Sequence, residues 1–150
     1  MTVTVRPLRA ADLPAVVRID ARHSGRTARP YWERVLPAFL RARGEGVRVG
    51  LAAESGGKLA GYLLGEVRAF EFGSEPCGWI FAVGIEPRLS RAGIASRLLE
   101  EACARFRAAG IARVRTMVRR GDVPVLAFFR ANGFAGGSFL QLERDLKETA

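Results

Sequence analysis

The sequence predicts a mixed α/β fold, in which helices pack against a sheet of antiparallel and parallel strands. Apolar residues recur at helical spacing over residues 95–106, and a nearly continuous apolar run over residues 78–85 is typical of a buried central strand. A turn at residues 55–57 separates two strand-like segments and predicts a hairpin. Because hairpins alternate with helical crossovers, the expected order of elements is β-α-α-β-β-β-α-β-α-β.

In the first half of the chain, apolar spacing and turn residues predict a strand, two helices and a hairpin. Pro7 ends the first strand, and Asp12 is expected to cap the helix that follows. The expected elements are a strand at 3–7, a helix from 13, a polar loop at 23–29, a helix at 31–43, and hairpin strands at 47–54 and 59–67.

In the second half, strands are expected to alternate with helices. The clearest helix begins at Gly93 and closes at Gly110, with charged residues opposite its apolar face. The other expected elements are strands at 78–85, 114–118 and 138–146, and a short helix at 125–131.

Length and composition predict a single domain over residues 1–150. Apolar residues make up 49% and charged residues 26% of the chain, which suits a packed core and argues against disorder. No apolar run approaches the roughly 20 residues that cross a bilayer, and no secretory signal is recognised. Cys77 and Cys103 form no paired motif, which is typical of a reduced cytoplasmic protein without structural zinc.

The net charge of +9 comes from basic residues that, apart from Lys58 and Lys147, are all arginine. They are scattered from Arg6 to Arg144, with only short pairs such as Arg119–Arg120. Nucleic-acid binding favours a concentrated basic face, so no nucleic-acid partner is expected. The same excess charge would equally attract a polyanionic ligand.

The most informative segment runs from Val83 to Ser96. An apolar strand ends, a short turn follows, and a strong helix begins at Gly93. The first turn of a helix presents unpaired N–H groups, and small residues there let a diphosphate approach. Small residues also serve close helix packing, so both interpretations remain open here. Neither Gly-x-Gly-x-x-Gly nor Gly-Lys-Ser/Thr occurs, which excludes a dinucleotide fingerprint and a P-loop.

This segment resembles the cofactor motif of the GNAT N-acetyltransferases, Arg/Gln-x-x-Gly-x-Gly/Ala after a strand that ends in apolar-x-apolar-x-Pro. Residues 85–87 (Ile-Glu-Pro) and 90–95 (Ser-Arg-Ala-Gly-Ile-Ala) occupy those places. Residues 5–7 followed by residues 11–13 are similar to the family's opening strand and first helix, and residues 127–134 to its late helix. The three matches follow the family's order over nearly the whole chain.

The resemblance implies the GNAT fold and an N-acetyltransferase that moves an acetyl group from acetyl-CoA to a primary amine. Direct attack by the acceptor nitrogen in a ternary complex is expected, without a metal. A protein N-terminus, a lysine and a small-molecule amine remain open as acceptors. No membrane partner is expected, and a homodimer stays an open alternative because many relatives form dimers.

The resemblance also implies cofactor contacts. Backbone groups of Val83, Gly84 and Ile85 are expected to pair with the pantetheine arm like an added strand. The N–H of Ile85 is expected to polarise the thioester carbonyl. Asp122 falls where the family often has an Asn that contacts the cofactor, and Phe129 where it often has a Tyr near the sulfur. The diphosphate is expected against Ser90, Arg91, Ala92, Gly93, Ile94, Ala95 and Ser96.

Three residues depart from the family's pattern. Ser90 replaces Arg or Gln, which removes one side-chain contact to phosphate. Asp122 would bring negative charge near an anionic cofactor, and capping of the next helix is the preferred interpretation. Phe129 has no proton to give the departing thiolate, so catalysis is expected to rest on positioning and polarisation. A CoA-binding sensor or interaction module with weak or no catalytic activity is the alternative function.

The general base is not assigned by the sequence. Glu66, Glu71 and Glu86 are candidates by their expected proximity to the site, and each has the alternative of a solvated carboxylate or an amine-binding charge. His23, the only histidine, is expected in an exposed loop. Tyr31 and Trp32 are expected near the acceptor pocket, although helix packing explains Trp32 equally well.

Overall fold

The computed structural model of the chain describes residues 2–40, 47–69 and 71–147, without the side chain of Glu71. The chain divides into two compact units, residues 1–117 and 118–150, and each is described by itself.

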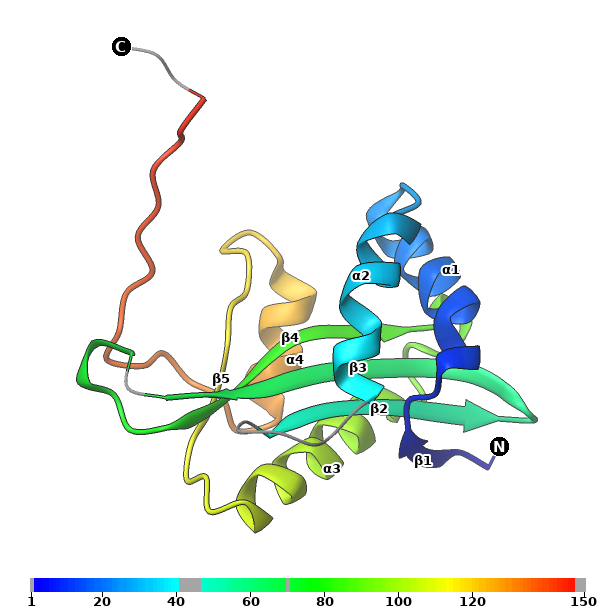
Figure 1. Cartoon of the computed structure of the whole chain (residues 1–150), viewed down its shortest axis with the longest axis horizontal. Coiled ribbons are helices and arrows are strands. Elements are labelled where there is room, and N and C mark those ends of the chain that lie inside the picture. The colour runs from blue at the N-terminus through cyan, green and yellow to red at the C-terminus, as the bar shows by residue number, and fades with distance from the viewer. Residues whose placement is uncertain (1, 41–46, 70, 148–150) are drawn as a thin grey trace. The chain divides into compact units, whose positions relative to one another are not determined.

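The first unit is built on a five-stranded sheet with the order β1-β2-β3-β4-β5 (Figure 1). The pairs from β1 to β4 are antiparallel, and β4 pairs with β5 in parallel. The mixed sheet predicted from the sequence is therefore confirmed. Its strands are β1 (Thr4–Pro7), β2 (Arg48–Ser55), β3 (Lys58–Arg68), β4 (Cys77–Ile85) and β5 (Val114–Thr116).

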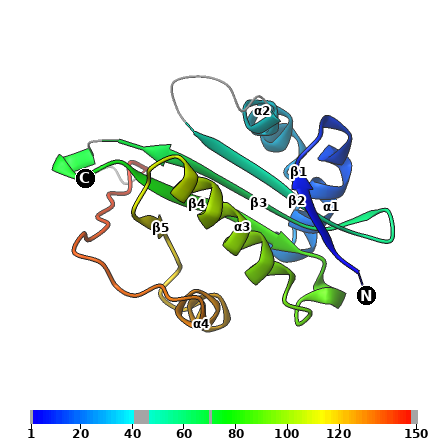
Figure 2. The ribbon, with the colours of Figure 1, turned by 90° about the horizontal axis from the view of Figure 1, so that it is seen from below.

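Helices cover both faces of this sheet (Figures 1 and 2). The pair α1 (Leu13–Ser24) and α2 (Arg29–Leu40) lies on one face, and α3 (Ile94–Ala108) lies on the other. Three short 3-10 turns, η1 (Ala10–Asp12), η2 (Glu71–Gly73) and η3 (Pro87–Leu89), connect these elements. Trp32 on α2 and Phe106 on α3 are buried on these two faces, at 3% and 0% exposure.

The second unit contains α4 (Val123–Ala131), as expected, but the strand expected at 138–146 is wrong. That stretch has no regular structure, and its Leu140, Leu142 and Leu146 are exposed. Alternating apolar residues favour a strand, yet a strand also needs a neighbour for its backbone hydrogen bonds. Among the described residues, no strand pairs with this stretch.

Two expectations near the N-terminus also need correction. The predicted loop at 23–29 begins later, because α1 continues to Ser24 and ends at Gly25, whose φ of 78° is left-handed. Asp12 stands at the start of α1 but makes no capping bond there. Its carboxylate accepts hydrogen bonds from the Arg6 guanidinium and from the backbone N–H of Arg9 instead.

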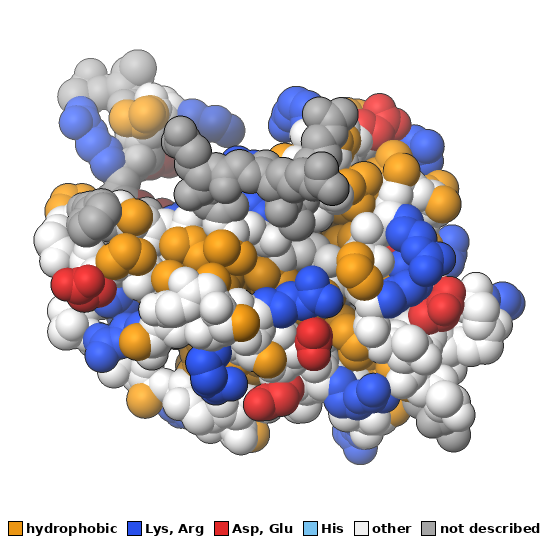
Figure 3. Space-filling model, turned by 60° about the horizontal axis from the view of Figure 1, so that its bottom comes forward, with side chains coloured by type: hydrophobic (Ala, Val, Ile, Leu, Met, Phe, Trp, Pro, Cys, Tyr) orange, Lys and Arg blue, Asp and Glu red, His pale blue; other side chains and the backbone are white. Residues whose placement is uncertain are grey.

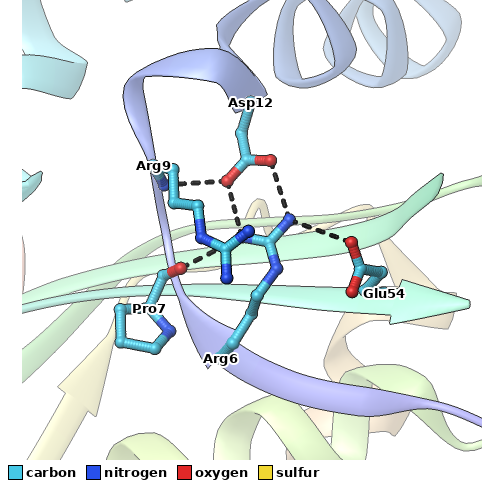
Figure 4. Close-up of polar contacts among 5 residues, drawn as sticks. All are labelled: Arg6, Pro7, Arg9, Asp12 and Glu54. Atoms are coloured by element: carbon cyan, nitrogen blue, oxygen red, sulfur yellow. Dashed lines mark hydrogen bonds and ion pairs between the residues drawn. The ribbon is translucent and has the colours of Figure 1, made fainter. Parts of the chain in front are cut away.

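Arg6 joins three elements through its guanidinium (Figure 4). Its Nη1 and Nη2 lie 2.8 and 2.9 Å from the Asp12 carboxylate, and Nη2 lies 3.5 Å from Oε1 of Glu54 on β2. The Arg6 and Asp12 side chains are only 12% and 10% exposed. Burial opposes ionisation of Asp12, but the hydrogen bonds from Arg6 and Arg9 prevail and lower the pKa of its carboxyl.

Glycines let α3 lie close to the sheet. A Cβ added at Gly78 would stand 2.8 Å from the Phe106 ring, and one added at Gly65 would meet the same ring at 3.2 Å. Phe106 is fully buried, so its ring cannot move aside. These two glycines therefore set how closely α3 packs.

Replacing Asp12 by Asn should destabilise the protein by about 3 kcal/mol, because the buried Arg6 guanidinium loses its carboxylate partner. Urea unfolding measures this free energy. The Asp12 pKa is lowered by folding, so its contribution is present above about pH 4 and is lost as the pH falls through the folded value. The difference between wild type and D12N should therefore shrink in acid.

The control is E33Q. Glu33 pairs with Arg29 at 2.8 Å, but both side chains are about half exposed, at 53% and 50%. Such a pair contributes about 0.5 kcal/mol or less. Equal losses in D12N and E33Q would contradict the importance of the buried pair.

Replacing Gly78 by Ala should cost about 1–3 kcal/mol through overpacking against Phe106. The double variant G78A/F106L should lose less than the sum of its single variants, because leucine removes the clashing ring atoms. Thermal and urea unfolding test both statements. G121A is the control, since a Cβ at Gly121 meets nothing within 4 Å, and additive losses in the double variant would count against the packing argument.

Candidate functional site

The two edges of β4 are bonded to different extents. One edge pairs with β3 from Cys77 to Ile85, whereas the described pairing with β5 stops at Ile80. The β3–β4 register shifts between Leu64, opposite Ala82, and Gly65, opposite Ile80, so that Phe81 is an extra residue in β4. A bulge of this kind bends a strand. Beyond it, the far edge of β4 is open in the first unit.

Along this open stretch of β4, the N–H and C=O groups of successive residues point alternately toward β3 and away from it. The N–H of Glu86 donates to the carbonyl of Ala60 at 2.8 Å, which makes these two residues a hydrogen-bonded pair. In an antiparallel ladder such pairs alternate, so Gly84 also faces β3, while Val83 and Ile85 turn their N–H and C=O away from it. Val83 and Ile85 therefore present polar groups at the open edge.

Gly84 serves packing on the other side of the strand. A Cβ at this position would stand 2.5 Å from the Tyr62 ring, which is buried against α1 and α2. Burial, followed by the charges of Asp20 and Tyr31, raises the pKa of the Tyr62 hydroxyl, which stays neutral. The close approach of Tyr62 requires glycine at position 84.

The last turn of α1 reaches the end of β4. Nε2 of His23 lies 2.6 Å from the carbonyl oxygen of Ile85, and Arg22 forms an ion pair with Glu86. Glu86 is buried, and Nε of Arg88 lies 4.0 Å from its carboxylate. Arg22 and His23, which are consecutive in α1, thus contact Glu86 and Ile85, which are consecutive at the end of β4.

After β4 the chain turns through η3 into α3. Gly93 is the residue before the helix, with a φ of 77° and no side chain to cap it. The first helical bond runs from the N–H of Arg97 to the carbonyl of Gly93, so the N–H groups of Ile94, Ala95 and Ser96 have no acceptor within the helix. A Cβ at Gly93 would meet nothing within 4 Å, so the space above this turn is open.

The other residues of this turn differ in exposure. Ser90, Arg91 and Ala92 are exposed, and Ala95 and Ser96 are partly buried. The side chain of Ile94 is only 1% exposed and belongs to the core. Ile94 could therefore meet a ligand only through its backbone.

The three glutamates considered as bases lie in different surroundings. Glu66 is paired with Arg68 at 3.5 Å and Arg48 at 3.9 Å, and stands opposite Trp79, at the other end of β4 from Ile85. The strand rise places Glu66 roughly 17 Å along β3 from Gly61, the residue opposite Ile85. Glu86 lies beside Ile85. The side chain of Glu71 lies outside the described residues.

Two further expected site residues belong to the second unit. The carboxylate of Asp122 accepts a hydrogen bond from the N–H of Val125 at 3.3 Å, which is the capping bond preferred from the sequence. Phe129 is buried, with its ring centroid 5.0 Å from those of Phe128 and Phe134.

His23 lies near the open edge, although the sequence analysis gave it no role in the site. Its polar neighbours suggested a loop, but Val16, Ile19 and His23 stand at i, i+3 and i+7. This spacing places all three residues on one face of a helix, and it was the signal in the sequence that His23 belongs to the helix and not to a loop. The exposure expected for His23 is correct, although its ring also contacts β4.

Three surface and composition features bear on the ligands considered from the sequence. On the face drawn in Figure 3, Lys and Arg side chains form separate patches with Asp and Glu side chains between them. Within residues 2–40, 47–69 and 71–147, no group of three or more His, Cys, Asp or Glu residues could hold a metal ion. None of the helices described in these ranges is long and apolar enough to cross a membrane.

Solved structures with similar folds include several N-acetyltransferases. An aminoglycoside acetyltransferase from an uncultured soil metagenomic sample is 19% identical, with a TM-score of 0.76 over 97% of each chain. The ribosomal-protein-alanine N-acetyltransferase of Brucella melitensis biovar Abortus is 14% identical, with a TM-score of 0.76 over 97% of this chain and 100% of that one. The PaiA N-acetyltransferase of Thermoplasma acidophilum, solved with coenzyme A, is 20% identical, with a TM-score of 0.71 over 90% and 91%.

These TM-scores show a shared fold, which confirms the fold predicted from the sequence. A comparison with curated protein sequences found no match. A model of the Acetyltransferase (GNAT) family matches residues 13–134, which is most of the chain. The chain therefore belongs to the Acetyltransferase (GNAT) family.

Proposed function

We propose that this acetyltransferase moves an acetyl group from acetyl-CoA to a primary amine by direct attack of the amine in a ternary complex. The observation that carries the proposal is the open edge of β4, which leads through one short turn to the free N–H groups at the start of α3. An extended amide-bearing arm can bond to such an edge like another strand, and a diphosphate suits a helix N-terminus.

The residues present fit this cosubstrate. Val83 offers its N–H and C=O groups and Ile85 its N–H group to the pantetheine arm, whereas the backbone of Gly84 is turned toward β3. The N–H groups of Ile94, Ala95 and Ser96 offer donors to the diphosphate, and the missing side chain of Gly93 leaves room for it. Exposed Arg91 adds positive charge to the same turn.

The chemistry proposed for this site is polarisation and positioning. The N–H of Ile85 faces the open edge and would polarise the thioester carbonyl, as a backbone donor does in an oxyanion hole. Phe129 supplies no proton, and a CoA thiolate can leave without one near neutral pH. Asp122 is given no cofactor role in this proposal, because its carboxylate caps α4.

The acceptor proposed is an amine of a small molecule or of a protein N-terminus. An aminoglycoside acetyltransferase and a ribosomal-protein-alanine N-acetyltransferase have similar folds. Aminoglycosides and peptides with an N-terminal alanine are therefore the first acceptors to test. Two free cysteines, Cys77 and Cys103, suit the reducing cytoplasm proposed as its location.

Replacing Gly93 by Trp should abolish binding of acetyl-CoA in isothermal titration, because the indole fills the space proposed for the diphosphate. G110W is the matched control. Gly110 follows the other end of α3, also has a left-handed φ (82°, against 77° at Gly93), and also has nothing within 4 Å of its Cβ position. G110W should therefore suffer the same backbone strain but bind acetyl-CoA as the wild type does.

The titration and a turnover assay separate the alternatives. Binding lost in G93W alone, with thiol release on an aminoglycoside or an alanine-terminated peptide, supports the acetyltransferase. Binding without turnover on any amine would favour the CoA-binding sensor that Phe129 suggests. Absence of binding to acetyl-CoA, propionyl-CoA and free CoA by the wild type would overturn the proposed cosubstrate.

A further inference from the structure

His23 lies against the backbone group that ends the open edge of β4. It belongs to the last turn of α1, and its Nε2 is 2.6 Å from the carbonyl oxygen of Ile85. The same carbonyl turns away from β3, toward the edge where the thioester is proposed to lie. His23 is also exposed, so an acceptor can reach its ring from solvent.

The contact with Ile85 determines which ring nitrogen holds the proton in the neutral imidazole. A carbonyl oxygen only accepts hydrogen bonds, so Nε2 must be the donor in this contact. The neutral ring then has its lone pair on Nδ1. His23 is thereby held with one nitrogen bonded to the strand and the other able to accept a proton.

The carboxylates considered from the sequence are less suited to this task. Glu86 is buried and engaged by Arg22, and Glu66 is paired with two arginines at the other end of the strands. Among the residues that the structure describes, His23 is thus the titratable side chain that directly contacts the open edge at Ile85.

Charged residues stand on the elements next to His23. Asp20 precedes it by one turn of α1 and accepts a hydrogen bond from Nε1 of Trp32 on α2 at 3.0 Å. Arg22 adjoins it in the chain, Glu86 follows β4, and Arg88 lies on η3.

We infer that His23 is a catalytic base, which accepts the proton of the attacking amine at Nδ1. This inference rests on the proposed function. The amine nitrogen forms a bond to the acetyl carbon, and the carbon–sulfur bond breaks with its electron pair leaving on sulfur. One N–H proton passes to Nδ1, and the imidazolium returns it to the thiolate or to water. The products are the amide and CoA thiol.

The tautomer can be observed without any activity. His23 is the only histidine, so long-range ¹⁵N–¹H spectra of the wild type contain one imidazole to interpret. We expect the neutral ring to carry its proton on Nε2. A neutral ring protonated on Nδ1 would overturn the inference, because its lone pair would then be on Nε2, facing the Ile85 carbonyl.

Kinetics of H23Q test the proton transfer. The side-chain amide of Gln keeps an N–H donor for the Ile85 carbonyl but cannot accept a proton. With the best acceptor found among an aminoglycoside and alanine- or lysine-containing peptides, kcat should fall by about 10²-fold. The KM for acetyl-CoA should stay within twofold. H23A should lose both kcat and part of the acetyl-CoA affinity, because it also releases Ile85.

The pH profile distinguishes a base from a residue that only supports structure. Protonation of the acceptor amine affects wild type and H23Q alike, so it cancels in the ratio of their kcat/KM values. A general base acts only while it is unprotonated, so this ratio should rise as the pH increases. A ratio independent of pH, or an H23Q kcat within twofold of wild type, would overturn the inference.

Failure of the proposed function gives a different result. If the wild type binds no acetyl-CoA in the titration, both the proposed cosubstrate and the proposed role of His23 are overturned. If the wild type binds it and turns over while H23Q keeps the wild-type rate and profile, only the role of His23 is overturned.

Discussion

The candidate site depends on the unequal bonding of the two edges of β4. Its pairing with β3 runs the length of the strand, whereas its pairing with β5 ends at Ile80. One extra residue, Phe81, marks the change. The polar groups of Val83 and Ile85 are consequently left for a partner outside the sheet. The proposed cosubstrate would bind along this short stretch of backbone, and His23, the proposed base, contacts the same stretch at Ile85.

Packing against glycine fixes the elements around that stretch. On one face, Gly65 and Gly78 make room for Phe106 and so set the position of α3 and of the turn at Gly93. On the other face, Gly84 makes room for Tyr62, while α1 reaches the strand end through Arg22 and His23. The candidate site is therefore held from both faces of the sheet by side-chain contacts.

Much of this arrangement could be predicted from the sequence, because apolar spacing is a local signal. The buried strand β4, the helix α3 and the glycine between them followed from it directly. The alternation of Leu140 and Leu142 led to the wrong prediction of a strand at 138–146. A strand also needs a neighbouring strand for its backbone hydrogen bonds, and no local sequence pattern supplies one. The direction of the Val83 and Ile85 carbonyls likewise depends on register and on the bulge at Phe81, which are set by the whole sheet.

Among the described residues, arginine supplies the cation of the ion pairs that tie these elements together, from Arg6 with Asp12 to Arg22 with Glu86. A guanidinium remains protonated throughout the physiological range, so it offers no nucleophile to a thioester, whereas a lysine amine is open to acetylation. This framework is thus resistant to acetylation by the proposed cosubstrate. Lys58 and Lys147 are the only lysines, so nearly all of the positive charge would persist at a high concentration of acetyl donor. A lysine in place of Arg22 would make the ion pair with Glu86 susceptible to loss by acetylation.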